Sequence, residues 1–200
     1  MSRSRRGSAD SEDGVMVRKV VAALAACGVV CAAPAARAGE LQLYGGPGAQ
    51  ASTWRGDGAI STAARLGYRM RGLFAIDALT RIGYSTVDSR MLTYVSLGGT
   101  LYGNIRDVIR PYVRLALVHQ HEEPVSAVRD DPFGAVFGVG NGIRHRGGFG
   151  SSLGVDFAVS KRKDVEWVLG ADVSGAWFPD PRGPVAYAGG ALWAGLNYSL

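Results

Sequence analysis

The sequence predicts an all-β fold, a single antiparallel up-and-down β-barrel that crosses a membrane. Apolar and polar residues alternate with period two along most of the chain after residue 38. Turn-forming residues divide this alternation into runs of about ten residues, the length of a membrane-crossing strand. An export signal precedes the runs, and exported chains of this pattern turn their apolar faces towards lipid. A soluble β-sandwich that buries the same faces is the alternative.

Residues 1–38 are predicted to be an N-terminal extension and a cleavable signal peptide. Arg18 and Lys19 stand before the apolar run 20–33. Small residues then define a cleavage site between Ala38 and Gly39. Because the apolar run is shorter than the roughly 20 residues that a membrane-spanning helix needs, we expect export by a Sec-type signal.

Three alternatives concern this N-terminal segment. Leu24-Ala25-Ala26-Cys27 has the form of a lipoprotein cleavage box, in which Cys27 would carry lipid. Met16 is a second candidate for the translation start besides Met1, since residues 1–15 show no apolar period. A twin-arginine signal at Arg5-Arg6 is disfavoured, because the apolar residues that should follow are absent.

The composition of the exported part argues against disulfide bonds and against a nucleic-acid partner. Both cysteines, Cys27 and Cys31, lie in the signal, so residues 39–200 form no disulfide. The whole chain has a formal net charge of +5, but six of its 22 Lys and Arg residues and three of its 17 Asp and Glu residues precede Gly39. The exported part keeps a net charge of only +2, so we expect no nucleic-acid partner.

The hairpin 59–84 shows the alternation most clearly. Its first strand carries Arg65 and Arg69 opposite an apolar face. Its second strand carries Asp77 and Arg81 opposite a face of the same kind. Successive side chains of a strand point to opposite sides, so the hairpin has one apolar face and one charged face.

The other runs follow the same rule and end at residues that favour turns. In chain order the predicted strands are Glu40–Ser52, Ala59–Met70, Leu73–Tyr84, Met91–Tyr102, Val108–His121, Phe133–His145, Gly150–Ser160, Val165–Phe178 and Val185–Leu200. Between them lie clusters such as Trp54–Gly58, Arg71-Gly72, Asp88-Ser89, Gly103-Asn104, Arg146-Gly147-Gly148, Lys161–Asp164 and Pro179–Pro184. No linker divides residues 39–200, which we expect to form one domain.

Nine strands conflict with the even number found in bacterial outer-membrane barrels. Either one run is wrongly assigned, or a weak tenth strand is hidden. From the chain length we predict eight strands, with ten as the second choice.

The inward faces are predicted to carry charges of both signs, interleaved with Gly and Ala. Small residues fit a narrow lumen, and opposite charges can pair within it. The predicted lumen charges are Arg65, Arg69, Asp77, Arg81, Arg114, Asp156, Glu166 and Asp172. Aromatic residues near the strand ends are expected to form the interfacial girdles. They are Tyr68, Tyr84, Trp167, Trp177, Phe178 and Tyr198.

Three segments resemble the OmpA-like small outer-membrane β-barrel family. Leu66–Arg69 with Phe74–Asp77 looks like the family's second and third strands, and Arg110–Leu117, which opens Arg-Pro-Tyr, resembles its fifth. The closing segment 192–200 is similar to the last strand, which the outer-membrane barrel-assembly machinery reads, but it ends in Leu200 instead of an aromatic residue. The resemblance implies an integral protein of the bacterial outer membrane, in contact with lipid and lipopolysaccharide, with no catalytic residues.

We therefore expect a structural, anchoring or surface-interaction role, without catalysis and without a cofactor. The interior of an eight-stranded barrel is filled by side chains, which disfavours a general pore. The polar loop Glu122–Pro132 is expected outside the cell, because its charges and prolines do not suit hydrocarbon. Two alternatives are a narrow channel for small solutes or ions and a surface lipid-modifying hydrolase that uses His119 or His121.

Histidine is concentrated in the segment His119-Gln120-His121-Glu122, and His145 is the only other histidine. Residues two apart on a strand point the same way, so His119 and His121 are the candidates for a shared metal ion. Strand parity places both on the outer face and Glu122 inside. With Phe133–His145 as a strand, His145 would lie roughly 30 Å from the pair. We therefore predict interfacial histidines near lipid headgroups and no metal site.

Overall fold

The computed structural model describes residues 39–54, 56–70, 73–85, 87 and 89–200. The described residues belong to one compact unit. The predicted signal peptide, including Ala38 of its cleavage site, lies outside the described residues. Among the residues that are described, no helix has the length and apolar character to cross a membrane.

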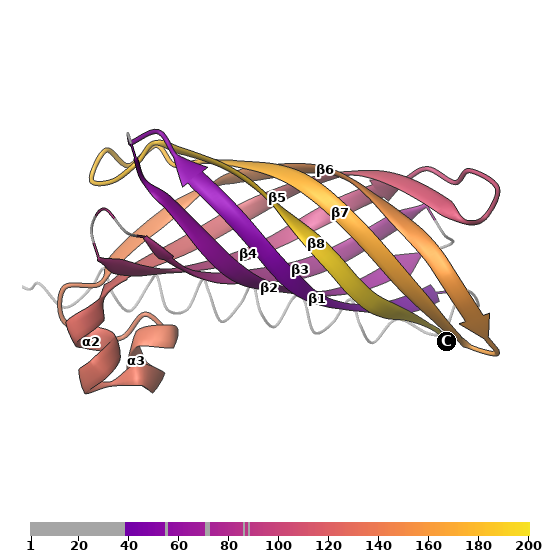
Figure 1. Ribbon diagram of the computed structural model, residues 1–200, viewed down its shortest axis with the longest axis horizontal. Helices are drawn as coiled ribbons and strands as arrows, with labels where there is room; N and C mark the ends of the chain where they lie inside the picture. Colours follow the sequence, from indigo (N-terminus) through magenta and orange to yellow (C-terminus); the bar gives the residue numbers. More distant parts are fainter. Residues whose placement is uncertain (1–38, 55, 71–72, 86, 88) are drawn as a thin grey trace, which may run out of the picture. The chain divides into compact units, whose positions relative to one another are not determined.

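Eight antiparallel strands close into a barrel in which each strand pairs with its neighbours in sequence (Figure 1). The strands are β1 (Gly39–Ser52), β2 (Gly58–Met70), β3 (Phe74–Ser85), β4 (Arg90–Tyr102), β5 (Ile109–Pro124), β6 (Arg144–Arg162), β7 (Val165–Trp177) and β8 (Ala186–Ser199). Pairing of β1 with β8 closes the barrel, from Glu40 opposite Ser199 to Ser52 opposite Tyr187. The predicted up-and-down barrel and its strand number of eight are confirmed.

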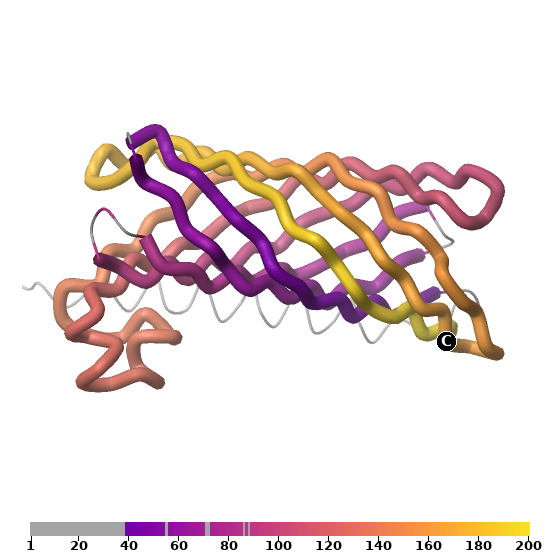
Figure 2. The backbone as a smooth tube through the Cα atoms, in the orientation of Figure 1, coloured from indigo at the N-terminus to yellow at the C-terminus, as the bar shows by residue number. Residues whose placement is uncertain are grey.

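The two ends of the barrel differ in the length of their connections (Figure 2). Connections of two to six residues, after β2, β4 and β6, lie at the end where β1 begins and β8 finishes. The opposite end carries the two longest connections, residues 178–185 and, above all, residues 125–143. This segment contains two short helices, α2 (Val125–Asp130) and α3 (Pro132–Val136).

The predicted strand Phe133–His145 is wrong, and it is the surplus ninth strand. Its first residues form α3, where the Gly134 N–H donates to the side chain of Asp131 at 2.9 Å. A capping Asp followed by Pro at the first helical position is a helix-start signal. Glycines with positive φ then break any strand: Gly138, Gly140 and Gly142.

Strands β5 and β6 reach farther than predicted at this end. Glu122 belongs to β5 and lies opposite Arg144 of β6. Arg146, which was predicted to lie in a turn, is a β6 residue opposite Gln120. The loop therefore comprises residues 125–143 instead of Glu122–Pro132.

The two faces of the barrel wall have the predicted chemistry. In β2, Ile60 is 84% exposed on the outside, whereas the neighbouring strand positions 59 and 61 are buried. Apolar residues of other strands are likewise exposed on the outer face: Leu97, Leu115, Leu117, Leu153, Val173 and Leu192. Charged residues occupy the inner face, so the wall is apolar outside and polar inside.

Five of the six predicted girdle aromatics are exposed near strand ends, namely Tyr68, Tyr84, Trp167, Trp177 and Tyr198. The sixth prediction, Phe178, is wrong. Phe178 follows Trp177 directly, so its side chain takes the opposite side of the wall, where it is fully buried. The Arg146 guanidinium lies 4.7 Å from the centre of its ring.

Candidate functional site

Two groups of polar side chains stand out, one inside the barrel and one on the outer face of its rim. All eight residues predicted as lumen charges are buried in the interior, each no more than 7% exposed: Arg65, Arg69, Asp77, Arg81, Arg114, Asp156, Glu166 and Asp172. They come from five different strands. The closed sheet therefore directs these charges towards one another.

Opposite charges pair within the lumen. Arg81 of β3 donates to Asp172 of β7 at 3.1 Å. Arg65 of β2 lies 3.4 Å from the Asp156 carboxylate of β6. These two ion pairs join strands that are four apart in the barrel, so their side chains cross the lumen.

A third pair connects nearer strands of the barrel. Arg114 Nε donates to Asp77 Oδ1 at 2.5 Å, and the Thr100 hydroxyl donates to the other Asp77 oxygen at 2.5 Å. Arg114 also donates to the Ser96 hydroxyl at 3.0 Å. Both charges of this pair are thus hydrogen-bonded away from water, which is the condition for stable burial.

The remaining two predicted charges pair with residues that the sequence analysis missed. Arg69 pairs with Glu40, and Glu166 accepts from Arg110 Nη2 at 2.8 Å. The signal for Arg110 was available, because it shares strand parity with Arg114. Glu40 is the second residue of β1, and so near the start of a strand there are too few residues to reveal an alternation of apolar and polar positions.

Aromatic rings fill the space between these pairs. The Arg65 guanidinium lies 4.4 Å from the ring centre of Tyr44 and 5.0 Å from that of Tyr112. A Cβ at Gly154 would come within 2.3 Å of the Tyr112 ring, so only glycine leaves room for it. One interior cavity, between Arg81 and Tyr187, measures about 10 Å³, which is room for about one water molecule.

The inner side of the rim holds a separate charge cluster. Glu122 pairs with Arg144 at 2.6 Å and with Arg146 at 2.8 Å. Arg146 also donates to the carbonyl oxygens of Asp180 at 2.9 Å and Pro184 at 2.6 Å. Arg146 thereby connects the barrel wall to the loop 178–185.

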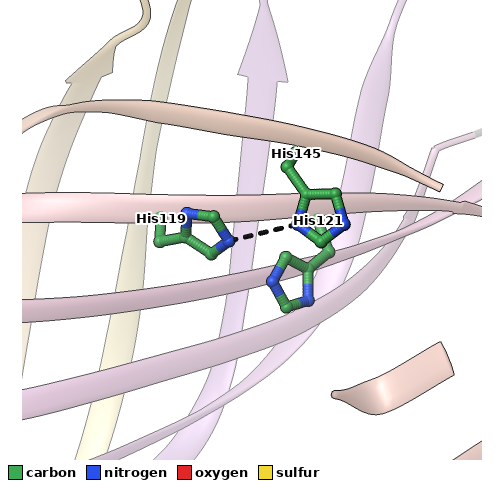
Figure 3. A group of neighbouring side chains, drawn as sticks. All are labelled: His119, His121 and His145. Atoms are coloured by element: carbon green, nitrogen blue, oxygen red, sulfur yellow. Dashed lines mark hydrogen bonds between the residues drawn. The ribbon is translucent and has the colours of Figure 1, made fainter. Parts of the chain in front are cut away.

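The second group consists of the three histidines, which lie together on the outer face of the same rim (Figure 3). His145 is the register partner of His121, and His119 follows two positions along β5. Their candidate ligand nitrogens all lie within 4.8 Å of one another. The predicted separation of roughly 30 Å is wrong, because residues 133–143 belong to a loop and β6 begins beside His121.

The three rings contact one another closely. His145 Nδ1 lies 3.4 Å from His119 Nε2, a hydrogen-bonding distance (Figure 3). The ring centres of His119 and His121 are 4.6 Å apart, and those of His121 and His145 are 4.8 Å apart. His119 and His145 are exposed, whereas His121 is only 8% exposed.

A carboxylate lies beside His121 on the same outer face. Glu123 Oε1 lies 3.7 Å from His121 Nδ1, and the Thr93 hydroxyl donates to Glu123 Oε2 at 3.5 Å. Glu123 is only 1% exposed although its strand position faces outwards, since α2 contacts β4 and β5 there. We call His119, His121, His145 and Glu123 the rim cluster.

The loop 178–185 provides a charged neighbour for the rim cluster. Arg182 pairs with Asp180 at 2.5 Å and also donates to the His145 carbonyl oxygen at 3.4 Å. Hydrogen bonds from Arg182 lower the pKa of Asp180 to about 2. The Asp180 carboxylate therefore stays ionised at ordinary pH and remains paired with Arg182.

No protein-family model matches the sequence, and a comparison with curated proteins found no match. Solved structures do match. The N-terminal β-barrel domain of Pseudomonas aeruginosa OprF is 15% identical, with 80% of this chain and 99% of that chain covered and a TM-score of 0.54. Neisserial surface protein A (NspA) is 18% identical over 81% and 97% of the two chains, with a TM-score of 0.53.

The attachment invasion locus protein Ail of Yersinia pestis is also similar. It is 11% identical over 82% of this chain and 99% of that chain, with a TM-score of 0.51. The three proteins are small barrels of the bacterial outer membrane. This chain has the fold of the OmpA-like small outer-membrane β-barrels.

Proposed function

We propose that this chain is an integral protein of the bacterial outer membrane with a structural, anchoring or surface-interaction role. In this proposal the lumen is closed by side chains and the barrel performs no catalysis. The observation that carries it is the contrast between the apolar, exposed outer wall and the paired charges of the interior.

The outer wall supports membrane insertion. Leu115 and Leu117 are 66% and 64% exposed, and Leu153 on the neighbouring strand is 59% exposed. An apolar surface that continues from strand to strand is unfavourable in water but suits a bilayer. Lipid and lipopolysaccharide would surround this wall. Strand β8 would be the contact for the barrel-assembly machinery.

The interior supports a closed lumen. The pairs Arg65–Asp156 and Arg81–Asp172 cross it, and aromatic rings lie between them. Separating a buried ion pair leaves uncompensated charge in a poorly hydrated space, which is strongly unfavourable. The narrow-channel alternative requires such a separation, whereas the closed state keeps each pair intact.

The connections at the two ends of the barrel support an orientation of the barrel in the outer membrane. Outer-membrane barrels have short periplasmic turns and long external loops. The end that holds Gly39 and Leu200 would then face the periplasm, and the loop 125–143 would face the exterior. This large loop, with Phe133 and Phe137 exposed on it, is the surface best placed for an external contact.

Fractionation of cells that express the full chain tests the membrane assignment. The protein should stay in the outer-membrane fraction after a carbonate wash, and it should migrate differently on gels before and after boiling. Recovery from the soluble periplasm would reject the proposal and favour the β-sandwich. An epitope inserted at Ser126 should be labelled on intact cells, and labelling only after permeabilisation would invert the topology.

Planar-bilayer recordings test the closed lumen separately. The purified barrel should give no stable conductance steps, and Asp172→Ala, which removes a partner of a cross-lumen pair, should be the variant most prone to conduct. Steady ion-selective steps from the wild-type protein would favour the narrow channel.

A further inference from the structure

We propose that the rim cluster binds one divalent transition-metal ion, for which Zn²⁺ is the probe. His119, His121 and His145 would supply three nitrogen ligands and Glu123 an oxygen ligand. This inference goes beyond the proposed structural role. It rests on the local geometry of β4, β5 and β6, so it stands or falls independently of how the barrel serves the cell.

The spacing of the nitrogens suits a single ion. Two ligand nitrogens at ~2.0–2.1 Å from a tetrahedral Zn²⁺ lie about 3.3 Å apart. His145 Nδ1 and His119 Nε2 are already 3.4 Å apart. The third nitrogen, from His121, lies within 4.8 Å of both, so small side-chain rotations bring it into the same sphere.

Glu123 supplies the candidate oxygen for the fourth position. Glu123 Oε1 lies 3.7 Å from His121 Nδ1. Both atoms are buried and have no hydrogen-bond partner among the residues that the structure describes. Buried polar atoms normally have a hydrogen-bond partner, so two unpartnered atoms that face each other need an explanation. A bound cation would satisfy both at once.

The sheet positions these ligands before any ion arrives. His121 lies opposite Thr93 of β4 and His145 of β6, so the ladder holds two ligands at adjacent sites on one face. Thr93 donates to Glu123 Oε2 and leaves Oε1 directed to His121. Such support from a second layer of residues is typical of metal sites.

The donor set selects the class of ion. Imidazole nitrogens favour zinc, copper and nickel, whereas calcium and magnesium take oxygen ligands. The exposed edges of His119 and His145 leave a route of entry from solvent. Because those two residues are on different strands, the ion would also join β5 to β6 at the base of the loop 125–143.

Zinc titration of the full-length barrel in detergent micelles tests the proposal. We expect saturable binding of one ion per chain, measured by competition with a chromophoric chelator. His121→Ala should weaken the affinity by more than about 100-fold, since loss of a direct ligand exceeds the 10–100-fold cost of losing a supporting residue. Ca²⁺ and Mg²⁺ should not compete.

Controls separate binding from folding. Ser151→Ala changes an exposed outer-face residue of β6 away from the cluster and should leave the Zn²⁺ affinity unchanged. Each variant is first shown to fold by its heat-modifiable migration on gels. Should His121→Ala misfold, His119→Ala and His145→Ala change exposed side chains and must show the same loss.

A spectroscopic readout identifies the ligands. Co²⁺ bound at the site should give the visible absorption of a tetrahedral complex, which Zn²⁺ then abolishes. Glu123→Gln should alter this spectrum and lower the Zn²⁺ affinity by at least about 10-fold. The proposal is overturned if no stoichiometric binding occurs, or if the affinity is the same in the wild type and the three histidine variants.

Discussion

The interior and the rim cluster place polar groups in opposite situations. Inside, Arg114 and Asp77 are both 2% exposed or less and are joined to each other and to neighbouring hydroxyls. At the rim, His121 Nδ1 and Glu123 Oε1 face each other with no hydrogen bond between them. The Arg114–Asp77 pair thus has its charges matched within the lumen, whereas the rim cluster offers two facing ligand atoms to an ion.

This difference separates structural polarity from polarity that can serve binding. The paired charges hold opposite strands together, and each charge already has a counter-charge of opposite sign beside it. The rim cluster lies on the face that is apolar elsewhere, directly beyond Leu117 of the same strand. Polar residues at outward-facing strand positions, where a lipid-facing wall should be apolar, therefore indicate a binding site more strongly than polar residues in the interior do.

The largest effect should follow from breaking an interior pair. Asp77→Ala leaves Arg114 buried without its counter-charge and should lower the free energy of unfolding by about 3–5 kcal/mol. Urea titration of the barrel in micelles, followed by gel migration, measures this loss. Adding Arg114→Met should recover part of it, because the second change removes the unpaired charge.

The matched control for this prediction is the exposed pair Arg129–Asp130, whose side chains are 80% and 73% exposed. Asp130→Ala should change stability by only about 0–1 kcal/mol, since water already solvates both charges. Equal losses from Asp77→Ala and Asp130→Ala would mean that the interior is hydrated, and the contrast drawn above would fail.

The next largest effect concerns the apolar outer face of the barrel wall. Leu115→Arg should oppose insertion by about 2–4 kcal/mol, because it places a charge near the bilayer midplane. Ala116→Ser points into the lumen and should be tolerated. Assembly into liposomes, scored by protease protection, measures both variants. Similar yields would show that the outer face does not contact lipid.

Which residues of the wall face the interior follows from strand parity, which can be read from the sequence. Arg65 and Asp156 lie far apart in the chain, yet each was placed inside by its immediate neighbours alone. Closure of eight strands then brings them together without further information. The strand number was less certain, since apolar residues of the loop, such as Phe133 and Val139, mimic a strand pattern.

The rim cluster could not be predicted because it depends on register. His121 and His145 meet only if residues 125–143 form a loop whose ends lie side by side. Treating Phe133–His145 as a strand moved His145 to the far end of the barrel. The Asp131-Pro132 helix start and the glycines after it indicate that this segment is a loop. Neither feature, however, shows from the sequence that the loop returns the chain to His121.

The smallest effect should arise where the loop contacts the rim cluster. Gly138 has φ of +73°, and a Cβ there would lie 2.5 Å from Cε1 of His121. Gly138→Ala should therefore displace the His121 ring and cost about 1–2 kcal/mol locally, from the left-handed backbone alone. Zn²⁺ affinity should fall, by less than in His121→Ala, while the barrel keeps its heat-modifiable migration.

Gly142→Ala separates the ring contact from the backbone strain. Gly142 has a similar φ of +77°, but a Cβ there would meet only Pro124 Cγ, at an ordinary 3.6 Å. Both variants strain the loop, and only Gly138→Ala reaches His121. Zinc affinity should consequently fall in Gly138→Ala and stay near the wild-type value in Gly142→Ala. The same loss in both would indicate that loop strain, and not the position of His121, controls the site.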